Sequence, residues 1–261
     1  MSGETGRLCR WAAAAWLSAL ALTTACGERD DDADADADAD AERRPPLGAM
    51  ALAFDGAAHY ATSGTAAFPF AANPQTISLW AHPEGTAAQQ ALVVLRRDFE
   101  SGVVVGLRDG ELEAWSAYHG RTFARSTEPL TPGWHHLAYV WTGAEHRVYL
   151  DGAQVGAGSD EPQNRTPTSC FIGSMDGSRD LYAGRLDELR IWSVARSEEQ
   201  IALEAAGTIA DDLSTLVAYF AFDELSGLRA FDGSGLGNHA SLGDGVPERA
   251  PARVASEIET P

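Results

Sequence analysis

Short stretches in which apolar and polar residues alternate follow one another from residue 47 onward, separated by Gly, Pro, Asp and Asn. Alternation with a period of two is typical of β-strands, and the separating residues favour turns. The pattern predicts twelve strands, over residues 51–54, 59–62, 76–82, 91–96, 103–108, 111–117, 122–126, 134–142, 147–150, 168–173, 183–192 and 217–222. Long helical apolar patterns are nearly absent, so we expect an all-β fold of two antiparallel sheets.

Two tight hairpins are explicit in the sequence. Asp-Gly pairs at 109–110 and 151–152 each separate two strand patterns. A two-residue hairpin turn requires positive φ angles, which Asp and Gly tolerate. These positions therefore predict direct connections between neighbouring antiparallel strands.

One short helix is predicted over residues 197–206. Ser197 and Gln200 have the spacing of a capping box. Glu198 and Glu199 fall in the first turn, where negative charge interacts favourably with the helix dipole.

The N-terminal segment has the pattern of a secretory signal. Its apolar run, 11–22, follows two arginines and is too short to span a bilayer comfortably. The sequence Leu-Thr-Thr-Ala-Cys that ends at Cys26 resembles the lipobox of bacterial lipoproteins, which implies a signal peptide over 1–25 and lipidation of Cys26. The alternative is an ordinary signal peptide cleaved near Ala25. Gly27 lacks the acidity of an inner-membrane retention signal, so we expect an outer-membrane lipoprotein of the bacterial cell envelope, or a secreted protein.

Residues 26–46 form an acidic, low-complexity stretch in which Asp alternates with Ala. It contains nine acidic residues and three arginines, and it has no large apolar residue. Such a segment cannot bury enough surface to offset the entropy cost of ordering. We therefore expect a disordered, self-repelling tether.

The net charge restricts the class of partner, and the positions of the cysteines restrict the possible disulfides. The formal net charge of −19 disfavours nucleic acid as a partner, because phosphate binding needs a basic face. Of the three cysteines, only Cys170 lies in the predicted domain, whereas Cys9 lies in the leader and Cys26 at its end. A disulfide within the domain is therefore not expected, and Cys170 is predicted to be a buried, unreactive thiol.

Three segments carry a family resemblance: ALAFDGAAHYATS from Ala51, WHHLAYVWTGAEHRVYLDG from Trp134 and GRLDELRIWSVARSEEQI from Gly184. In this order they resemble the laminin-G-like jellyroll of the concanavalin A-like lectin/glucanase superfamily. The resemblance implies a two-sheet antiparallel jellyroll sandwich with one short helix over 47–250, followed by a disordered tail over 251–261. The chain departs from the family at residues 141–142, where a Tyr-Asp pair is usual.

The run AYFAFDELSGLRAFDGSGLGNHASL from Ala218 resembles the segment that commonly opens such domains, but here it follows the helix. It could begin a truncated second repeat, or it could pair beside the first strand and close the sheet. Too few residues remain for a second sandwich, so we favour closure.

The sequence offers no convincing catalytic constellation. Asp187 and Glu188 are adjacent on a predicted strand, so their carboxylates point to opposite faces, and the same holds for His135 and His136. A glycosidase needs two carboxylates that face one cleft. We therefore expect structural roles for both histidines and no enzymatic activity.

Calcium is the one plausible ion, because it prefers hard oxygen ligands. Four aspartates near predicted strand ends would converge if the C-terminal segment closes the sheet: Asp55, Asp187, Asp223 and Asp232. Asp55 and Asp232 each precede Gly and are equally well explained as turn residues.

The best candidate for sugar binding lies at the end of one predicted strand. Trp115, Tyr118, His119 and Arg121 combine aromatic surface with polar groups, as a sugar requires. Core packing would explain Trp115 alone equally well. Three other tryptophans fall inside strand patterns and are expected in the core: Trp80, Trp134 and Trp192.

These features favour a non-catalytic recognition domain, tethered to the cell surface, that binds a glycan or an extracellular protein. The alternative is a structural or adhesive envelope protein without a small ligand. A glycoside-active enzyme is the third and least favoured interpretation. Fold alone does not decide among them.

Overall fold

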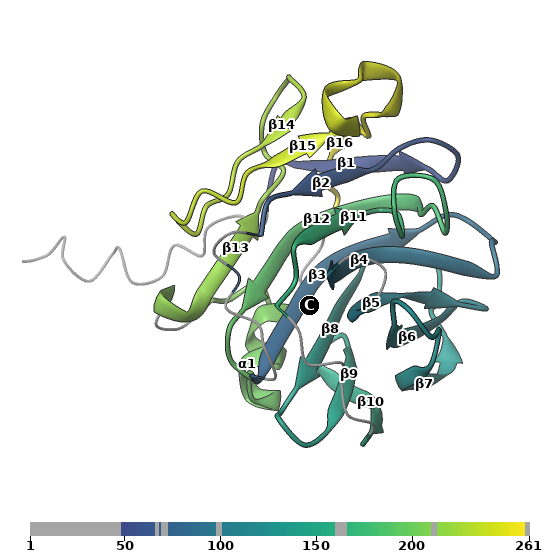
Figure 1. Cartoon of the computed structure of the whole chain (residues 1–261), viewed down its shortest axis with the longest axis vertical. Helices are drawn as coiled ribbons and strands as arrows, with labels where there is room; N and C mark the ends of the chain where they lie inside the picture. Colours follow the sequence, from purple (N-terminus) through teal and green to yellow (C-terminus); the bar gives the residue numbers. More distant parts are fainter. Residues whose placement is uncertain are drawn as a thin grey trace, which may run out of the picture. The chain divides into compact units, whose positions relative to one another are not determined.

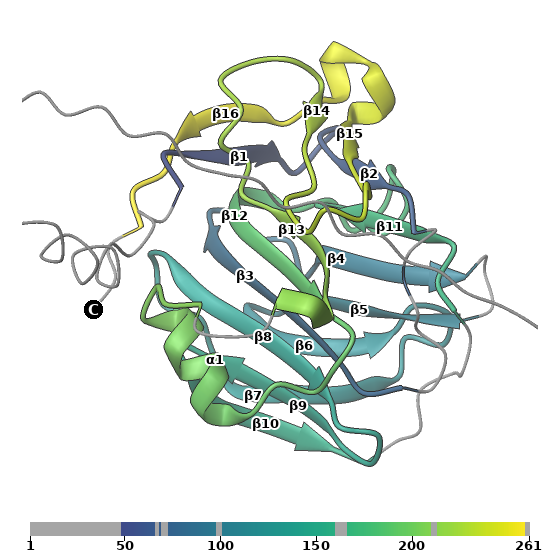
Figure 2. The same cartoon turned by 90° about the vertical axis from the view of Figure 1, so that its left-hand side faces the viewer.

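The computed structural model describes residues 48–65, 68, 73–97, 101–159, 166–209 and 213–258. These residues form two antiparallel sheets of eight strands each (Figures 1 and 2). The predicted all-β, two-sheet architecture is confirmed.

Sheet A consists of β1 Met50–Asp55, β3 Gln75–Pro83, β8 His135–Trp141, β9 His146–Leu150, β10 Ala153–Gly158, β12 Ala183–Trp192, β13 Leu216–Phe220 and β16 Ala252–Ala255. Its order is β10-β9-β8-β3-β12-β1-β16, and β13 also pairs with β12. Sheet B consists of β2 Ala61–Ser63, β4 Gln89–Arg97, β5 Ser101–Arg108, β6 Glu111–Ser116, β7 Thr122–Pro129, β11 Ser169–Ile172, β14 Arg229–Ala230 and β15 Ala240–Leu242. Its order is β14-β15-β2-β11-β4-β5-β6-β7.

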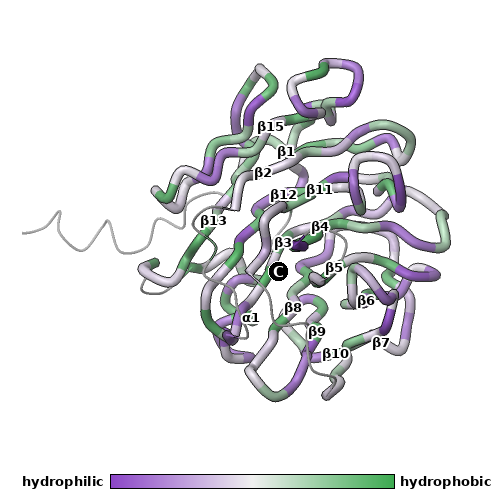
Figure 3. Tube along the Cα trace, viewed as in Figure 1, coloured by the Kyte–Doolittle hydropathy of each residue, from purple (hydrophilic) through white to green (hydrophobic). Residues whose placement is uncertain are grey.

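The main core lies between the two sheets, and the strands supply it by alternation (Figure 3). On β8, Leu137, Tyr139 and Trp141 belong to this core. Ala138 and Val140 belong to a separate cluster on the other face, which packs against the helix. A fully buried aliphatic side chain contributes roughly 1.5–3 kcal/mol, so these two faces hold β8 in register.

The predicted helix is present as α1, Glu198–Ala205. Ser197 caps it and forms the expected reciprocal capping box with Gln200. Ile201 joins the cluster on the outer face of sheet A, so α1 covers that face near β8 and β9 (Figure 2). Three short 3₁₀ helices follow it in the chain: η1 Leu213–Thr215, η2 Gly243–Gly245 and η3 Pro247–Arg249.

Both predicted hairpin turns are confirmed. Asp109 and Gly110 have φ angles of 54° and 82°, and Asp151 and Gly152 have φ angles of 50° and 86°. These left-handed angles match the twist of the strands that the turns connect.

The C-terminal segment closes the fold beside its first strands, as expected, but by a different pairing. β13 pairs with β12, and not with β1. Closure comes later in the chain, where β15 pairs with β2 and β16 pairs with β1 (Figure 1).

The predicted disordered tail over 251–261 is wrong for residues 252–255, because they form β16 and pair with Met50–Ala53. The expectation missed these residues because four residues carry too little alternation to reveal a strand. β10, β14 and β15 are also absent from the predicted strands.

The predicted signal peptide, Cys26 and the acidic tether lie outside the described residues. Within the described part of the chain, no helix is both long enough and apolar enough to cross a membrane.

Candidate functional site

The face of sheet B that points away from the inter-sheet core carries the first set of candidate residues. Along β5, Val103 and Val105 enter the core, whereas Val104 lies in a cluster on the outer face. Register pairing aligns one outer row across β11, β4, β5, β6 and β7, formed by Phe171, Val94, Val104, Trp115 and Thr122.

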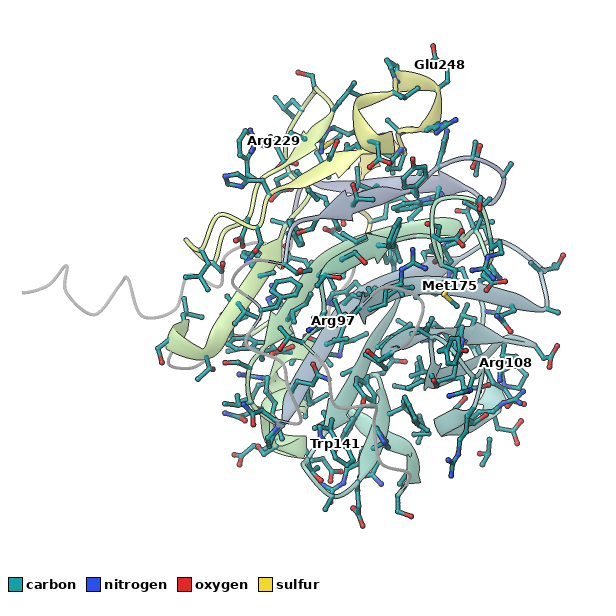
Figure 4. The ribbon with its side chains drawn as sticks, in the orientation of Figure 1. Arg97, Arg108, Trp141, Met175, Arg229 and Glu248 are labelled. Carbon is teal, nitrogen blue, oxygen red and sulfur yellow. The ribbon has the colours of Figure 1, made fainter. Side chains whose placement is uncertain are left out.

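Trp115 lies in this outer row but is only 1% exposed. It packs in a cluster that includes Val104 and Met175, and the guanidinium carbon of Arg108 lies 4.9 Å from the centre of its ring. Figure 4 labels Arg108, at the end of β5, and Met175, in the loop after β11. The prediction that Trp115 forms an exposed platform is therefore wrong, because a loop and an arginine cover the face on which it lies.

Glu113 is a fully buried carboxylate on the same face of β6. Its Oε1 accepts hydrogen bonds from Arg108 Nη1 at 2.7 Å and from Thr122 Oγ1 at 2.6 Å. Its Oε2 lies 3.6 Å from Arg125 Nε and accepts no hydrogen bond within the described residues. Two arginines thus compensate the buried charge, as burial of a carboxylate requires.

Glu111 alternates with Glu113 along β6, so both side chains lie on the outer face. This pair is absent from the predicted site, although the run Glu-Leu-Glu-Ala-Trp contained the signal. Arg125 forms ion pairs with both carboxylates. Glu113 therefore holds Arg108, whose guanidinium lies over the Trp115 ring, and both glutamates hold Arg125.

The turn between β6 and β7 brings the other three predicted binding residues, Tyr118, His119 and Arg121, to the surface. Ser116 fixes this turn, because its hydroxyl accepts a hydrogen bond from His119 N at 3.2 Å and its carbonyl accepts one from Gly120 N at 3.0 Å. The Tyr118 and His119 rings meet edge to face, with centres 4.4 Å apart. Tyr118 is 57% exposed, so a hydrogen-bonded turn presents an open aromatic surface beside polar groups.

A second exposed aromatic side chain, Phe231, follows β14 and is 55% exposed. The His239 ring meets it edge to face with centres 5.3 Å apart, and the guanidinium carbon of Arg229 lies 5.7 Å from the Phe231 centre. This group is not apparent in the sequence, because the two ends of the loop 231–239 come together only in the fold.

Asp232 holds this loop in shape. Its carboxylate accepts hydrogen bonds from the backbone N–H groups of Tyr219, Ser234 and Asn238 at 2.9–3.0 Å. Burial opposes ionisation of Asp232, but these backbone bonds outweigh it and lower the pKa. Its own N–H donates to His239 Nδ1 at 3.0 Å, which orients the imidazole.

Asp55, another predicted calcium ligand, also serves its own turn. Its Oδ1 accepts hydrogen bonds from the backbone N–H groups of residues 57, 58 and 59 at 2.9–3.0 Å. Burial opposes ionisation, yet these three bonds lower the pKa of Asp55 to about 2.

Asp187 lies at a bulge, where the pairing of β12 with β3 shifts register before Arg190 and where Glu188 has a φ of 53°. The Asp187 carboxylate accepts hydrogen bonds from Ser256 Oγ at 2.6 Å and from Glu188 N at 2.8 Å. Burial raises the pKa of Asp187 to about 8, and the carboxylates of Glu188 and Asp223 add to this rise.

Glu188 and Asp223 fix the first described residues of the chain. They accept hydrogen bonds from Gly48 N at 3.2 Å and from Met50 N at 2.9 Å, respectively. The described residues contain no group of three or more His, Cys, Asp or Glu that could hold a metal ion. The four predicted ligands therefore do not form one such group, because Asp55 and Asp232 accept hydrogen bonds within their own turns, whereas Asp187 and Asp223 lie near each other beside Glu188. Calcium binding itself stays a prediction.

His135 and His136 point to opposite sides of β8, as predicted. His135 Nδ1 lies 2.7 Å from Asp151 Oδ2 in the β9–β10 turn, and this hydrogen bond raises the pKa of His135. His136 is fully buried, with its Nε2 3.7 Å from Glu204 Oε2 on α1. Each histidine thus joins β8 to a neighbouring element.

The expected core positions are confirmed for Trp80, Trp192 and Cys170, which are buried. Burial raises the pKa of the Cys170 thiol to about 12, so the reactive thiolate is disfavoured. Trp134 precedes β8 and is half-buried, with its ring centre 5.6 Å from that of His82.

Comparison with protein families gives one match. A model of the laminin-G-like type, described as the concanavalin A-like lectin/glucanases superfamily, matches residues 55–202. Among curated proteins, none matches this sequence.

Solved structures share the fold at low sequence identity. A protein from Bacteroides ovatus, provisionally described as carbohydrate binding, is 17% identical with a TM-score of 0.63, and the match covers 82% of this chain and 62% of that one. This chain therefore spans less than two thirds of the Bacteroides protein.

A SAP-like pentraxin from Limulus polyphemus is 15% identical with a TM-score of 0.51, over 75% of this chain and 95% of that one. Domain 4 of an extracellular arabinanase from Geobacillus stearothermophilus, in complex with arabinotriose, is 21% identical with a TM-score of 0.50, over 59% of this chain and 76% of that one. Since the family model covers more than half of the sequence, this chain belongs to the laminin-G-like group of the concanavalin A-like lectin/glucanases superfamily.

Proposed function

We propose that this chain is a non-catalytic glycan-binding protein whose binding surface includes the β6–β7 turn. The observation that carries the proposal is the exposed Tyr118 ring, which lies edge to face with His119 on a turn fixed by Ser116. Sugars present apolar ring faces together with hydroxyl edges, so they bind where an open aromatic surface adjoins polar groups. Arg121, exposed on the same turn, supplies further donors.

The comparisons support this class of ligand. The Bacteroides protein carries a provisional description as carbohydrate binding, and the arabinanase domain was solved with a bound arabinose trisaccharide. The β6–β7 turn is exposed at the end of sheet B, whereas α1 covers part of the outer face of sheet A. We therefore expect the ligand at this end of sheet B and not on its outer face, part of which the loop after β11 and Arg108 cover.

We also propose that Cys26 is lipidated and that the Asp/Ala-rich segment holds the domain away from the outer membrane. Support comes from the lipobox-like sequence that ends at Cys26 and from the acidic composition of residues 26–46. In this arrangement the domain would sample glycans outside the cell.

The test is retention of the full chain on four immobilised linear polysaccharides: arabinan, xylan, (1,4)-β-glucan and polygalacturonate. We expect one of them to retain the protein and Tyr118→Ala to weaken binding of its trisaccharide about tenfold, which corresponds to about 1.4 kcal/mol. Leu213→Ala is the matched control, because Leu213 is 56% exposed and lies on η1, which leads into sheet A. Failure of all four polymers to retain the protein would contradict the proposal and favour a structural or adhesive role.

A further inference from the structure

Two exposed aromatic–histidine pairs lie at the same end of sheet B: Tyr118–His119 and Phe231–His239. One continuous row of paired residues joins them across seven strands, formed by Ala230, Ala240, Ser63, Cys170, Leu95, Val103 and Ser116. Phe231 directly follows the first residue of this row, and Tyr118 comes two residues after the last. The two aromatic–histidine pairs therefore lie at the first and the last strand of this row, and the row follows the strand ends along one side of sheet B.

The distance between the pairs follows from the sheet. Neighbouring strands lie about 4.8 Å apart, so the six steps of the row span about 29 Å. A mono- or disaccharide cannot reach across such a span, whereas an extended chain of several sugars can.

The two pairs offer the same chemistry. Each combines a half-exposed ring, a histidine edge-on to that ring and a nearby arginine: Tyr118, His119 and Arg121 at one end, and Phe231, His239 and Arg229 at the other. His239 Nδ1 accepts a hydrogen bond from Asp232 N, so the neutral imidazole carries its proton on Nε2 and can donate it. Both ends can thus stack against a sugar ring and donate to its oxygens.

Between the two pairs, three described residues at this end of the sheet are exposed: Gly64 after β2, Arg97 at the end of β4 and Thr168 before β11. A chain lying across the strand ends would meet these residues.

We propose that a single linear polysaccharide lies across this end of sheet B and is held at both aromatic–histidine pairs. The inference rests on the proposed glycan-binding function and extends it to the form of the ligand. Once one pair holds the chain, engagement of the second is intramolecular, so affinity rises steeply when the chain becomes long enough to bridge both.

The experiment uses the full chain, the polysaccharide that retains it among the four named above, and size-fractionated oligosaccharides of that polymer from the trisaccharide upward. Titration calorimetry is performed on the wild type, Tyr118→Ala, Phe231→Ala, the double variant and the control Leu213→Ala. All the substituted side chains are more than half exposed, and thermal unfolding verifies that the variants are folded.

We expect the wild type to bind two trisaccharides, each single variant to bind one, and the double variant to bind none. For oligosaccharides that can span about 29 Å, we expect affinity at least tenfold above that of the trisaccharide in the wild type, and loss of this gain in both single variants.

Two results would overturn the inference while leaving glycan binding intact. One is unchanged polymer affinity in Phe231→Ala beside weakened binding in Tyr118→Ala. The other is an affinity in the wild type that does not increase with oligosaccharide length. If the wild type binds none of the polymers, the proposed function itself fails.

Discussion

Nδ1 of His135, at the start of β8, lies 2.7 Å from Oδ2 of Asp151, in the turn between β9 and β10. The hydrogen bond to Asp151 raises the pKa of His135 above its ordinary value of 6.5. Burial opposes ionisation of Asp151, but the hydrogen bonds from His135 and from the backbone N–H of His136, together with the charges of these histidines, outweigh it and lower the pKa of Asp151 below 3.8. This pair therefore makes the stability of the folded protein depend on pH in two ways, one at high pH through His135 and one at low pH through Asp151.

The charged form of His135 is favoured in the folded protein, so its stabilisation is complete below pH 6.5 and is lost as pH rises through the raised pKa. The contribution of Asp151 is complete above pH 3.8 and is lost as pH falls through its lowered pKa. We expect Asp151→Asn to lower Tm at about pH 5.5 and the difference from the wild type to shrink by about pH 9.

Asparagine also tolerates a positive φ, so this substitution preserves the turn. Asp109→Asn is the matched control, because Asp109 occupies the equivalent Asp-Gly turn but pairs with Arg125. A difference in Tm for Asp151→Asn that stays constant between the two pH values would contradict the assignment.

Asp187 should impose an opposite kind of pH dependence from that of a salt-bridged carboxylate. Its folded pKa of about 8 lies above the ordinary 3.8, so the folded protein binds more protons and stability falls as pH rises between these values. Asp187→Asn should remove this decline. We expect Tm of the variant to fall less than that of the wild type between about pH 4 and about pH 8, as followed by calorimetry.

The control for Asp187 is Asp109→Asn, because Asp109 is exposed in the β5–β6 turn of sheet B, whereas Asp187 lies on β12 of sheet A. Parallel curves for the wild type and Asp187→Asn would show that Asp187 is ionised in the folded protein at neutral pH.

Trp115→Ala should act on stability, because its ring is buried in the outer cluster of sheet B. Truncation of a buried tryptophan typically costs about 3–5 kcal/mol. We expect a free energy of unfolding lower by about that amount in urea, against a change within about 0.5 kcal/mol for the exposed Tyr118→Ala. An equal effect of the two substitutions on stability would contradict the burial of Trp115.

Glu204 anchors α1 to sheet A through buried polar contacts. Its carboxylate lies 2.7 Å from Arg196 Nε and accepts a hydrogen bond from Ser78 Oγ at 2.6 Å. Removal of one partner from a buried ion pair leaves an uncompensated charge, so Glu204→Gln should reduce the free energy of unfolding by roughly 3 kcal/mol. Glu199→Gln, on the exposed side of the same helix, should cost less than about 1 kcal/mol.

Lipidation can be tested by fractionation. We expect the wild type to partition with membranes and Cys26→Ala to appear in the soluble fraction. Cys170→Ala is the control, since that thiol is buried in the domain and should not affect partitioning. Membrane association of Cys26→Ala would contradict the lipobox interpretation.

Much of the fold could be predicted because it is encoded locally. The alternation in β8, the capping box at Ser197 and the Asp-Gly turns are each visible within a few residues. β14 and β15 escaped prediction because they have two and three residues, and pairing with strands distant in sequence defines them.

The candidate site was harder to predict than the fold. Alternation indicates that Trp115 and Glu113 share a face, but it cannot reveal that Arg108 and Met175 cover it. The Phe231–His239 contact was equally hidden, because it depends on how Asp232 folds its loop.

The position of β1 has a mechanical consequence. This first strand is hydrogen-bonded on both sides, to β12 through residues 52–55 and to β16 through residues 50–53. Any tension that reaches the domain from the preceding sequence enters at Gly48 and Met50, whose N–H groups are held by Glu188 and Asp223. To extract β1, a pulling force must break contacts with both flanking strands, so the domain should resist unravelling from the end by which it would be anchored.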